Sequence, residues 1–387
     1  MSLAFAERQP PTPHTPGEPA FAWREILLLF VGSRLTIYLI AALSLLIVNK
    51  GPYYTRSESW LDWFTRWDAA WFLDVAEHGY HFTRLGDSNN VVFLPLYPLL
   101  VRLATAGGFV SLKVAGYAVS FGCLWIACVW LWRAVVREWG DTQLATHAVA
   151  FLLFGPVSFF FSCIYSEALF LPLAIGCISF ARRQRWWLAG ILGAMAANTR
   201  LVGVLLALPL FWEFILSLRS VPRNRWLSRW PQFVASGLPI VGLAVFFLQM
   251  WLRFGDPLMY FHGQSYWGRH FTWWWGLFAN NSFTQQPAFY QIWFAAAVAS
   301  AFGLLVLGAR LRVPTAYLLW GLASEFVCIS ARSVEGLPRY FSVIFPLYIV
   351  LALLARRWPH LMSPLLALMV ALQTLSVVLF VNGYWFT

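Results

Sequence analysis

Charged residues are scarce in this sequence of 387 residues: Asp, Glu, Lys and Arg together make up 11% of it. Soluble globular domains carry about 25% charged residues, whereas 60% of this chain is hydrophobic. These values exclude a water-soluble domain and predict an integral membrane protein with many spans. The net charge of +11 does not indicate nucleic-acid binding, because arginine accumulates in the cytoplasmic loops of membrane proteins. Part of the excess suits anionic lipids or phosphates.

Signals for a nucleotide, a metal or a disulfide are also lacking. We find no Gly-rich nucleotide fingerprint and no internal repeat, and the five cysteines lack metal-type spacing. Each cysteine lies in or at the end of an apolar run, so we expect packing residues and no structural disulfide. A cleavable signal peptide is not apparent either. The first apolar run, 26–48, is too long for a signal sequence and should stay in the membrane as an anchor.

Long apolar runs follow one another along most of the chain. A helix needs about 20 apolar residues to cross the hydrocarbon core of a bilayer. Runs that reach or approach this length are 26–48, 114–132, 144–162, 168–181, 233–252, 289–307, 314–330, 340–354 and 361–381. A further stretch, 186–218, is too long for one crossing and short for two. There we predict two short arms, with Asn198, Thr199 and Arg200 at the tip of a break that lines a cavity or packs in protein.

Arginine clusters set the orientation of these spans, because cytoplasmic loops carry most Lys and Arg. Clusters at 182–185 and 219–229 flank the hairpin, and we expect both inside. The predicted fold class is therefore an all-α polytopic membrane protein of about eleven crossings, some short or broken. Residues 1–24 are predicted to form a disordered cytoplasmic tail and residues 25–387 a single transmembrane domain. The segments that then share the outer side are 49–113, 165–167, the tip at 198–200, 253–288 and 331–339.

The first outer loop carries an aromatic stripe at helical spacing. Its members are Trp60, Phe64, Trp67, Trp71 and Val75. A helix lying in the membrane interface explains such a stripe. We therefore expect an interfacial helix in this loop, where several carboxylates also lie.

Asp68 is the strongest candidate for a catalytic carboxylate in this loop. Asp62 and Arg66 are four residues apart, as are Asp74 and His78, so each pair can meet on a helix surface. Asp68 has no oppositely charged residue at such a spacing and is left to face a cavity. The other acids of the loop are as well explained by the solvation of a surface helix.

Charged residues near the ends of spans are candidates for binding. Glu167 opens a span, where a carboxylate is also favourable as a helix cap. Arg200 at the hairpin tip and Arg339 at the start of another span lie on the side that should be poor in arginine. A guanidinium stays charged and its fork of donors matches a phosphate. Anchoring at the membrane interface is the alternative for both arginines.

Six motifs together resemble the PIG-V family of mannosyltransferases, within the GT-C class of integral-membrane glycosyltransferases. In chain order they are RWDAAWFLDVAEHGY at 66–80, FLPLYP at 93–98, FGPVSFFFSCIYSEALF at 154–170, TRLVG at 199–203, GDPLMYF at 255–261 and LPRYFSVIFPLY at 337–348. The family pattern has His where Trp71 stands, a departure that leaves Asp68 matched. The short loops favour a bacterial relative.

This resemblance implies a polyprenyl-phosphate-linked mannose donor, used on the non-cytoplasmic side of the membrane. In eukaryotes the family adds a mannose to the glycosylphosphatidylinositol precursor in the endoplasmic reticulum. A bacterial relative would work at the outer face of the cytoplasmic membrane on a lipid or glycan acceptor. A lipid-linked donor also explains the missing nucleotide site.

With this donor we predict direct displacement at the anomeric carbon with inversion, and Asp68 as the base that takes the acceptor proton. Cations would stabilise the departing phosphate, namely Arg200 and Arg339 with Arg66 and Arg332 behind them. Further residues are predicted to contact the sugar, the prenyl chain or the acceptor; they are Trp67, Trp71, Tyr97, Glu167, Asp256 and His78. No metal ligands are assigned, and a divalent ion is left open.

Two alternatives stay open at this point. A GT-C enzyme for glucose, arabinose or a related sugar would present the same motifs. A lipid or solute transporter would also have many spans, intramembrane arginine and a broken hairpin. It would need polar groups near mid-bilayer, where Glu325 is a rare candidate.

Overall fold

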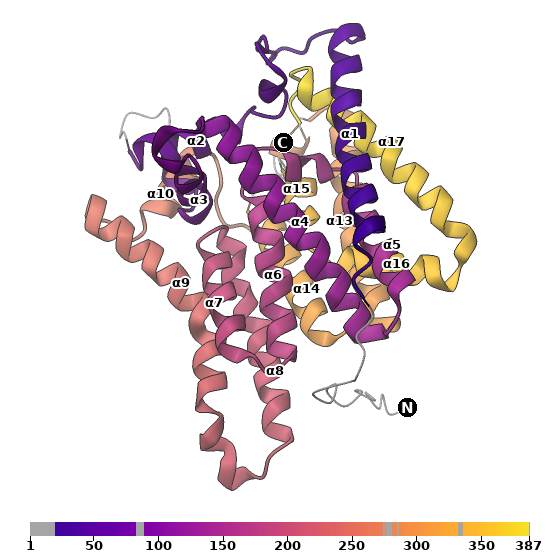
Figure 1. Cartoon of the computed structure of the whole chain (residues 1–387). Helices are drawn as coiled ribbons and strands as arrows, with labels where there is room; N and C mark the ends of the chain where they lie inside the picture. The colour runs from indigo at the N-terminus through magenta and orange to yellow at the C-terminus, as the bar shows by residue number, and fades with distance from the viewer. Residues whose placement is uncertain are drawn as a thin grey trace.

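The computed structural model describes residues 20–82, 89–273, 275, 281–284, 286–331 and 336–386, and residues 1–19 of the predicted tail lie outside this part. All regular structure in the described residues is helical, with no strand (Figure 1). The α-helices are α1 (Trp23–Ile47), α2 (Asp68–His78), α3 (Leu96–Ala104), α4 (Leu112–Trp139), α5 (Thr142–Leu153), α6 (Glu167–Arg182), α7 (Trp186–Ala197), α8 (Ala207–Arg219), α9 (Trp230–Phe254), α10 (Met259–Tyr266), α12 (Asn281–Thr284), α13 (Ala288–Arg310), α14 (Thr315–Ile329), α15 (Leu337–Ser342), α16 (Pro346–Arg357) and α17 (Met362–Val381). The 3-10 helices are η1 (Trp60–Asp62), η2 (Asn90–Val92), η3 (Ala106–Gly108), η4 (Ser158–Ser162), η5 (Leu201–Leu206), η6 (Arg223–Arg229) and η7 (Pro359–Leu361).

Six helical stretches of the described residues are long and apolar enough to cross a membrane. They are Trp23–Ile47, Leu112–Trp139, Leu201–Arg219, Arg223–Phe254, Ala288–Arg310 and Pro359–Val381. The shorter apolar helices α5, α7 and α14 lie between them in the chain. Every apolar run predicted from the sequence contains a helix, so the all-α polytopic fold class is confirmed.

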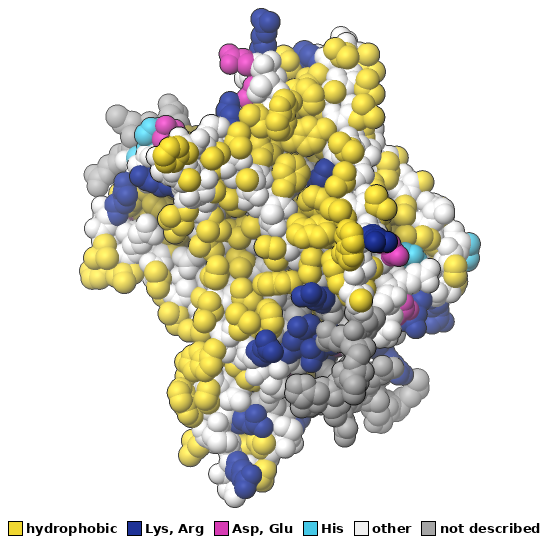
Figure 2. All heavy atoms as spheres, in the orientation of Figure 1, with side chains coloured by type: hydrophobic (Ala, Val, Ile, Leu, Met, Phe, Trp, Pro, Cys, Tyr) yellow, Lys and Arg dark blue, Asp and Glu magenta, His cyan; other side chains and the backbone are white. Residues whose placement is uncertain are grey.

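Arginine marks one end of this bundle. The last turns of α4, α6, α8, α13 and α16 all carry arginine, and dark blue side chains gather over the lower half of the face drawn in Figure 2. A cation in the last turn of a helix is favoured by the helix dipole. The labels α2, α3, α10 and α15 lie towards the opposite end of the molecule (Figure 1). The arginine-rich end is the one that the sequence predicts to be cytoplasmic.

The stretch 186–218 forms the two short arms that its length predicts, α7 and α8, separated by η5. In the break, Nδ2 of Asn198 donates to the carbonyl oxygens of Ala194 at 3.0 Å and Gly242 at 2.8 Å. The carbonyl of Asn198 accepts from the amide of Leu96 at 3.0 Å. These polar groups are therefore paired inside the protein, as a break at membrane depth requires. A Cβ at position 242 would lie 2.5 Å from the Ala194 oxygen, so only glycine allows this close approach of α9 to α7.

Helix α5 stops one residue before the Gly-Pro pair at 155–156, because proline cannot continue the helical hydrogen bonding. Two side chains from distant helices take the carbonyls that this break frees. Arg34 of α1 donates to the backbone oxygens of Leu153 at 2.8 Å and Ser158 at 3.1 Å. Gln373 of α17 donates to the Leu153 oxygen at 3.3 Å, and both donors are buried. These bonds fix η4, which leads into the start of α6.

The first outer loop contains a helix, α2, as predicted, but the aromatic stripe does not run along one continuous helix. The loop is divided into η1 and α2, and Trp67 between them has a positive φ of 55°. Arg66 donates to the hydroxyl and the carbonyl of Thr55, both at 3.0 Å, which holds a turn at this point. Asp62 pairs with Lys113 at 2.7 Å and not with Arg66. Helix α2 therefore begins directly after the turn, with a carboxylate at its N-terminus, where the helix dipole favours it.

Candidate active site

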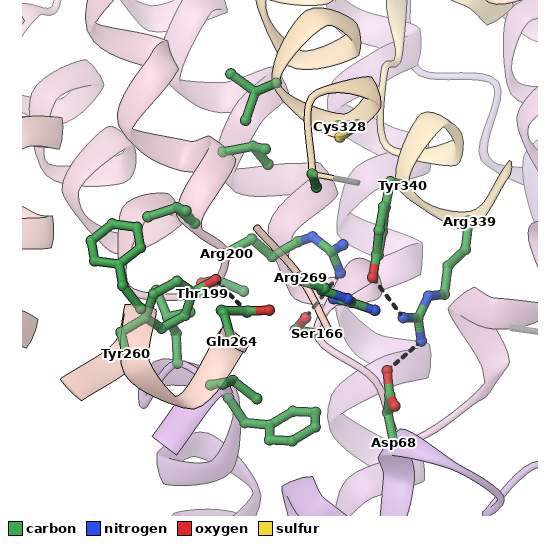
Figure 3. Close-up of a pocket in the computed structure, with 18 of the residues that line it drawn as sticks. Asp68, Ser166, Thr199, Arg200, Tyr260, Gln264, Arg269, Cys328, Arg339 and Tyr340 are labelled. Atoms are coloured by element: carbon green, nitrogen blue, oxygen red, sulfur yellow. Dashed lines mark hydrogen bonds and ion pairs between the residues drawn. The ribbon is translucent and has the colours of Figure 1, made fainter. Parts of the chain in front are cut away.

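Five charged side chains line one cavity of about 430 Å³. Figure 3 labels Asp68, Arg200, Arg269 and Arg339 among them. Each of the five comes from a short helix, the end of a helix or a break between helices. They are Asp68 at the start of α2, Glu167 at the start of α6, Arg200 between α7 and η5, Arg269 after α10, and Arg339 in α15. All but Arg269 are among the residues predicted from the sequence. The cavity thus joins segments as far as 271 positions apart in the chain.

Arg339 and Arg200 are paired with the two carboxylates. Nη1 of Arg339 donates to Oδ2 of Asp68 at 2.7 Å, and its Nε lies 3.3 Å from Oε1 of Glu167. Nη1 of Arg200 lies 2.6 Å from the same Glu167 oxygen and donates to Oγ of Ser166 at 3.2 Å. One guanidinium therefore links the first residue of α2 to the first residue of α6.

The two carboxylates differ in burial. The side chain of Asp68 is 25% exposed and that of Glu167 is 1% exposed. Among the described residues, neither oxygen of Glu167 has a well-aligned hydrogen-bond donor. Its charge is balanced by two arginines, but its lone pairs are unsatisfied, which is costly for a buried acceptor. Glu167 can therefore accept hydrogen bonds from a bound molecule, while Asp68 faces the open part of the cavity.

Tyr340 packs among the three arginines. Its ring centre lies 5.1 Å from the guanidinium carbons of Arg200 and Arg339 and 5.6 Å from that of Arg269. Such cation–π contacts favour a cation over an aromatic face and help three like charges to gather. No ion pair joins Arg269 to another described residue. Among the described residues that line the cavity, three arginines face two carboxylates, an excess of one positive charge.

The side of the cavity away from Asp68 is polar and uncharged. Nε2 of Gln264 donates to the hydroxyl of Tyr260 at 2.9 Å, and Thr199 lies close to both (Figure 3). Burial raises the pKa of Tyr260 to about 12, so its phenol is protonated at neutral pH. This wall can therefore donate and accept hydrogen bonds with a neutral polar group.

Three aromatic residues predicted to contact the ligand lie outside the cavity lining. Trp67 makes an edge contact with Trp385, with ring centres 4.7 Å apart. Trp71 stacks on Phe93 at 6.2 Å, and Tyr97 is fully buried in the core. Because Phe93 does line the cavity, Trp71 supports its wall from behind.

Several predicted polar residues also lie elsewhere. His78 pairs with the aspartate four residues before it at 3.1 Å, as the spacing predicts. Asp256 lies 2.6 Å from His262, and neither pair lines the cavity. The terminal nitrogens of Arg66 donate inside its own loop. Arg332 lies outside the described residues.

Some lining residues were not predicted from the sequence. Arg269, Tyr340, Tyr260 and Gln264 belong to this group. Two signals could have found the first two: Tyr340 follows Arg339 directly, and Arg269 is a cation in a loop predicted to be on the arginine-poor side.

No group of three or more His, Cys, Asp or Glu side chains that could hold a metal ion is found in the part of the chain that the structure describes. The two carboxylates of the cavity face arginines instead. All five cysteines are free thiols, and four of them are buried. We therefore assign neither metal ligands nor a disulfide.

The all-α membrane bundle is GT-C-like in its fold, as the sequence predicts. The chain superposes on the crystal structure of ArnT from Cupriavidus metallidurans bound to undecaprenyl phosphate with a TM-score of 0.54. The superposition covers 94% of this chain and 77% of that one. Sequence identity is 16%, so the similarity concerns the fold alone.

The family resemblance is confirmed at the level of sequence. Residues 30–220 match the family model described as Mannosyltransferase (PIG-V), so the chain is PIG-V-like over this part. It is 31% identical over 156 residues to GPI alpha-1,6-mannosyltransferase 2 of Cricetulus griseus, and 28% identical over 156 residues to that of Homo sapiens. Each match covers 38% of this chain and 31% of the relative. The matched part thus spans about a third of the length of these curated relatives.

Proposed function

We propose that this protein transfers mannose from a polyprenyl-phosphate-mannose donor to a hydroxyl of a lipid-linked or other extracytoplasmic acceptor, with inversion at the anomeric carbon. The observation that carries this proposal is the meeting of Asp68 and Glu167 with three arginines in one cavity. The similarity to GPI alpha-1,6-mannosyltransferase 2 supports mannose as the sugar. The fold is shared with ArnT, whose structure holds undecaprenyl phosphate, and this supports a lipid phosphate as a ligand.

Arg200, Arg269 and Arg339 are our candidates for binding the donor phosphate. Guanidinium groups match phosphate oxygens with two parallel donors and stay charged in a buried site. The excess positive charge of the cluster favours an anion there. Arg269 can offer its donors without breaking an ion pair to a described residue. We do not assign Arg66 to the phosphate, because Thr55 accepts its hydrogen bonds.

Asp68 is our candidate for the general base. The acceptor oxygen attacks the anomeric carbon from the face opposite the phosphate, and its proton passes to a carboxylate oxygen of Asp68. The bond from the anomeric carbon to the phosphate oxygen breaks, and its electron pair leaves with the polyprenyl phosphate. Arg339 donates a hydrogen bond to Asp68. Its positive charge therefore lies near the negative charge that is transferred from the acceptor oxygen to the leaving phosphate.

Glu167 and Gln264 are our candidates for holding the sugar. The unsatisfied oxygens of Glu167 can accept from sugar hydroxyls, and the amide of Gln264 can donate and accept. The neutral wall around Tyr260 and Thr199 suits an uncharged hexose. The leaving phosphate then faces the arginines and the hexose faces this wall.

We place the cavity on the extracytoplasmic face of the membrane, because the opposite end carries most of the arginine. In a bacterium this face is the outer side of the cytoplasmic membrane. In a eukaryote it is the lumenal side of the endoplasmic reticulum membrane.

The test is transfer by purified protein in lipid vesicles that contain radiolabelled polyprenyl-phosphate-mannose and candidate acceptor lipids. Labelled product that disappears with Asp68→Asn would support the proposal. Donors carrying glucose or arabinose test the choice of sugar in the same vesicles. Movement of the donor across the vesicle membrane without any product would indicate a transporter and contradict the proposal.

A further inference from the structure

A second cavity, of about 600 Å³, is lined by residues of α2, α3, α7 and α9. Figure 1 shows where these helices lie in the bundle. We call this cavity the α3–α9 groove. Its walls are mostly apolar and include Val75, Leu99, Ile191, Met195, Val241 and Val245. Several of these side chains are exposed, so the groove opens to the outside of the bundle. Its volume is within the range of about 300–1,000 Å³ that is common for ligand pockets.

Two arginines belong to the lining of the α3–α9 groove. Arg102 lies in the last turn of α3 and Arg253 in the last turn of α9, and both are exposed. The helix dipole favours a cation at each position separately, but it does not explain why two helices bring their arginines to one apolar groove. Neither arginine forms an ion pair with another described residue. The guanidinium of Arg253 lies against Gly79, where an added Cβ would be 3.5 Å from both terminal nitrogens.

The α3–α9 groove and the candidate active site share their dividing wall. In α2, Asp68 and Phe72 line the site, while Val75 and Ala76 line the groove. Residues 92–94 and 199–202 line the site. Their chain neighbours that line the groove are Pro95, Leu96, Pro98, Leu99, Ala194, Met195 and Asn198. Both cavities therefore lie towards the end of the bundle away from the arginine-rich turns, so the charge bias of cytoplasmic loops does not account for Arg102 and Arg253.

We propose that the α3–α9 groove binds an anionic phospholipid of the bilayer, with a hydrocarbon chain along the apolar walls and the phosphate on Arg102 and Arg253. The apolar walls favour a lipid over a free phosphate ion, because only a hydrocarbon chain would bury their apolar surface away from water. No Asp or Glu is among the described residues that line the groove. A zwitterionic lipid would therefore find no partner there for its positive group, and an anionic one is preferred. The inference does not rest on the proposed sugar transfer.

Photo-crosslinking in nanodiscs tests the role of the charges. Discs of phosphatidylcholine carry a small fraction of photoactivatable phosphatidylglycerol, and crosslinked peptides are read by mass spectrometry. We expect crosslinks to α3, α7 and α9 that fall about tenfold in Arg102→Gln/Arg253→Gln, since each lost hydrogen bond to a charged group weakens binding. The matched control is Arg225→Gln/Arg310→Gln, two exposed arginines outside the groove, which should label like the parent. Equal labelling of the groove in the Arg102/Arg253 double variant would overturn the proposal.

A second pair of variants tests the apolar walls without touching the charges. Val245→Trp should fill the groove and reduce the labelling, whereas Ile240→Trp, an equally exposed residue of α9 that does not line the groove, should not. Photoactivatable phosphatidylcholine that labels the groove as strongly as phosphatidylglycerol would also overturn the choice of an anionic lipid. Asp68→Asn should keep the labelling intact, so a failure of sugar transfer is distinguishable from a failure of lipid binding. Thermal unfolding of each variant checks that it is folded.

Discussion

Arg339 and Asp68 are 271 positions apart in the sequence, and a hydrogen bond of 2.7 Å joins Nη1 of the one to Oδ2 of the other. The same guanidinium is only 5% exposed and also lies beside Glu167. A charge-assisted bond in a site with little water is stronger than one at the surface. The position of the candidate base therefore depends on α15 as much as on its own helix α2.

Asp68→Asn should lower mannose transfer by about 10²–10⁴-fold, because a positioned general base contributes that much and an amide cannot take the proton. Expression should change little, since the amide keeps the shape of the side chain, whereas the unfolding temperature should fall because buried Arg339 loses a charged partner. Initial rates in vesicles give the measurement. Glu77→Gln is the matched control, an exposed acid on the same helix, and should keep full activity. Full activity in the Asp68 variant would remove this residue from the role.

Arg339→Gln and Glu167→Gln should be coupled in a double-mutant cycle. Both side chains are buried, and Nε of Arg339 lies 3.3 Å from Oε1 of Glu167. Removal of either charge therefore leaves the other with one partner fewer. We expect a coupling energy of about 0.5–3 kcal/mol, seen as a double variant that unfolds at a higher temperature than the sum of the two single losses predicts. Simple additivity of the two losses would show that the pair is not coupled.

Arg269→Gln should weaken binding of the donor more than it lowers kcat, the rate of transfer in the bound complex. The lost hydrogen bonds to a charged phosphate are worth about 1.5–3 kcal/mol, or roughly 10–100-fold in affinity. The measurement is KM for polyprenyl-phosphate-mannose together with binding of polyprenyl phosphate alone. Arg269→Lys keeps the charge and should recover part of the loss. An unchanged KM would exclude Arg269 from the phosphate site.

Arg34→Met should reduce both the thermal stability and the transfer rate. The change removes the arginine donor of the buried Ser158 carbonyl, and a buried group left unpaired costs about 1–3 kcal/mol. The Leu153 carbonyl keeps Gln373 and the Ser158 hydroxyl as donors. Because these bonds fix η4 ahead of α6, Glu167 should also be displaced from Arg200. Intrinsic tryptophan fluorescence during heating and the transfer assay measure the two effects.

The matched control for this prediction is Arg24→Gln, an exposed arginine on the same helix. Gln373→Leu should act in the same direction with a smaller effect, since it removes neutral hydrogen bonds. A stable and fully active Arg34 variant would show that the break after α5 does not depend on this side chain.

The sequence by itself determined where the helices are. In a bilayer each segment must satisfy its own backbone hydrogen bonds, so the length of an apolar run is enough to predict helices such as α1, α9 and α17. The same rule predicted the break at 198–200, because that stretch could not form one crossing or two. The Gly-Pro pair at 155–156 explains why α5 is shorter than its apolar run.

Only the tertiary structure decided which side chains meet in the cavity. Helical spacing predicted one face for Trp67 and Trp71. In the structure Trp67 lies in the turn before α2 and packs on Trp385, whereas Trp71 packs on Phe93. Arg269 carries no local signal that links it to Asp68. The physical reason is that helix formation depends on residues a few positions apart, whereas a site built from α2, α6, α10 and α15 depends on packing between segments that are distant in the chain.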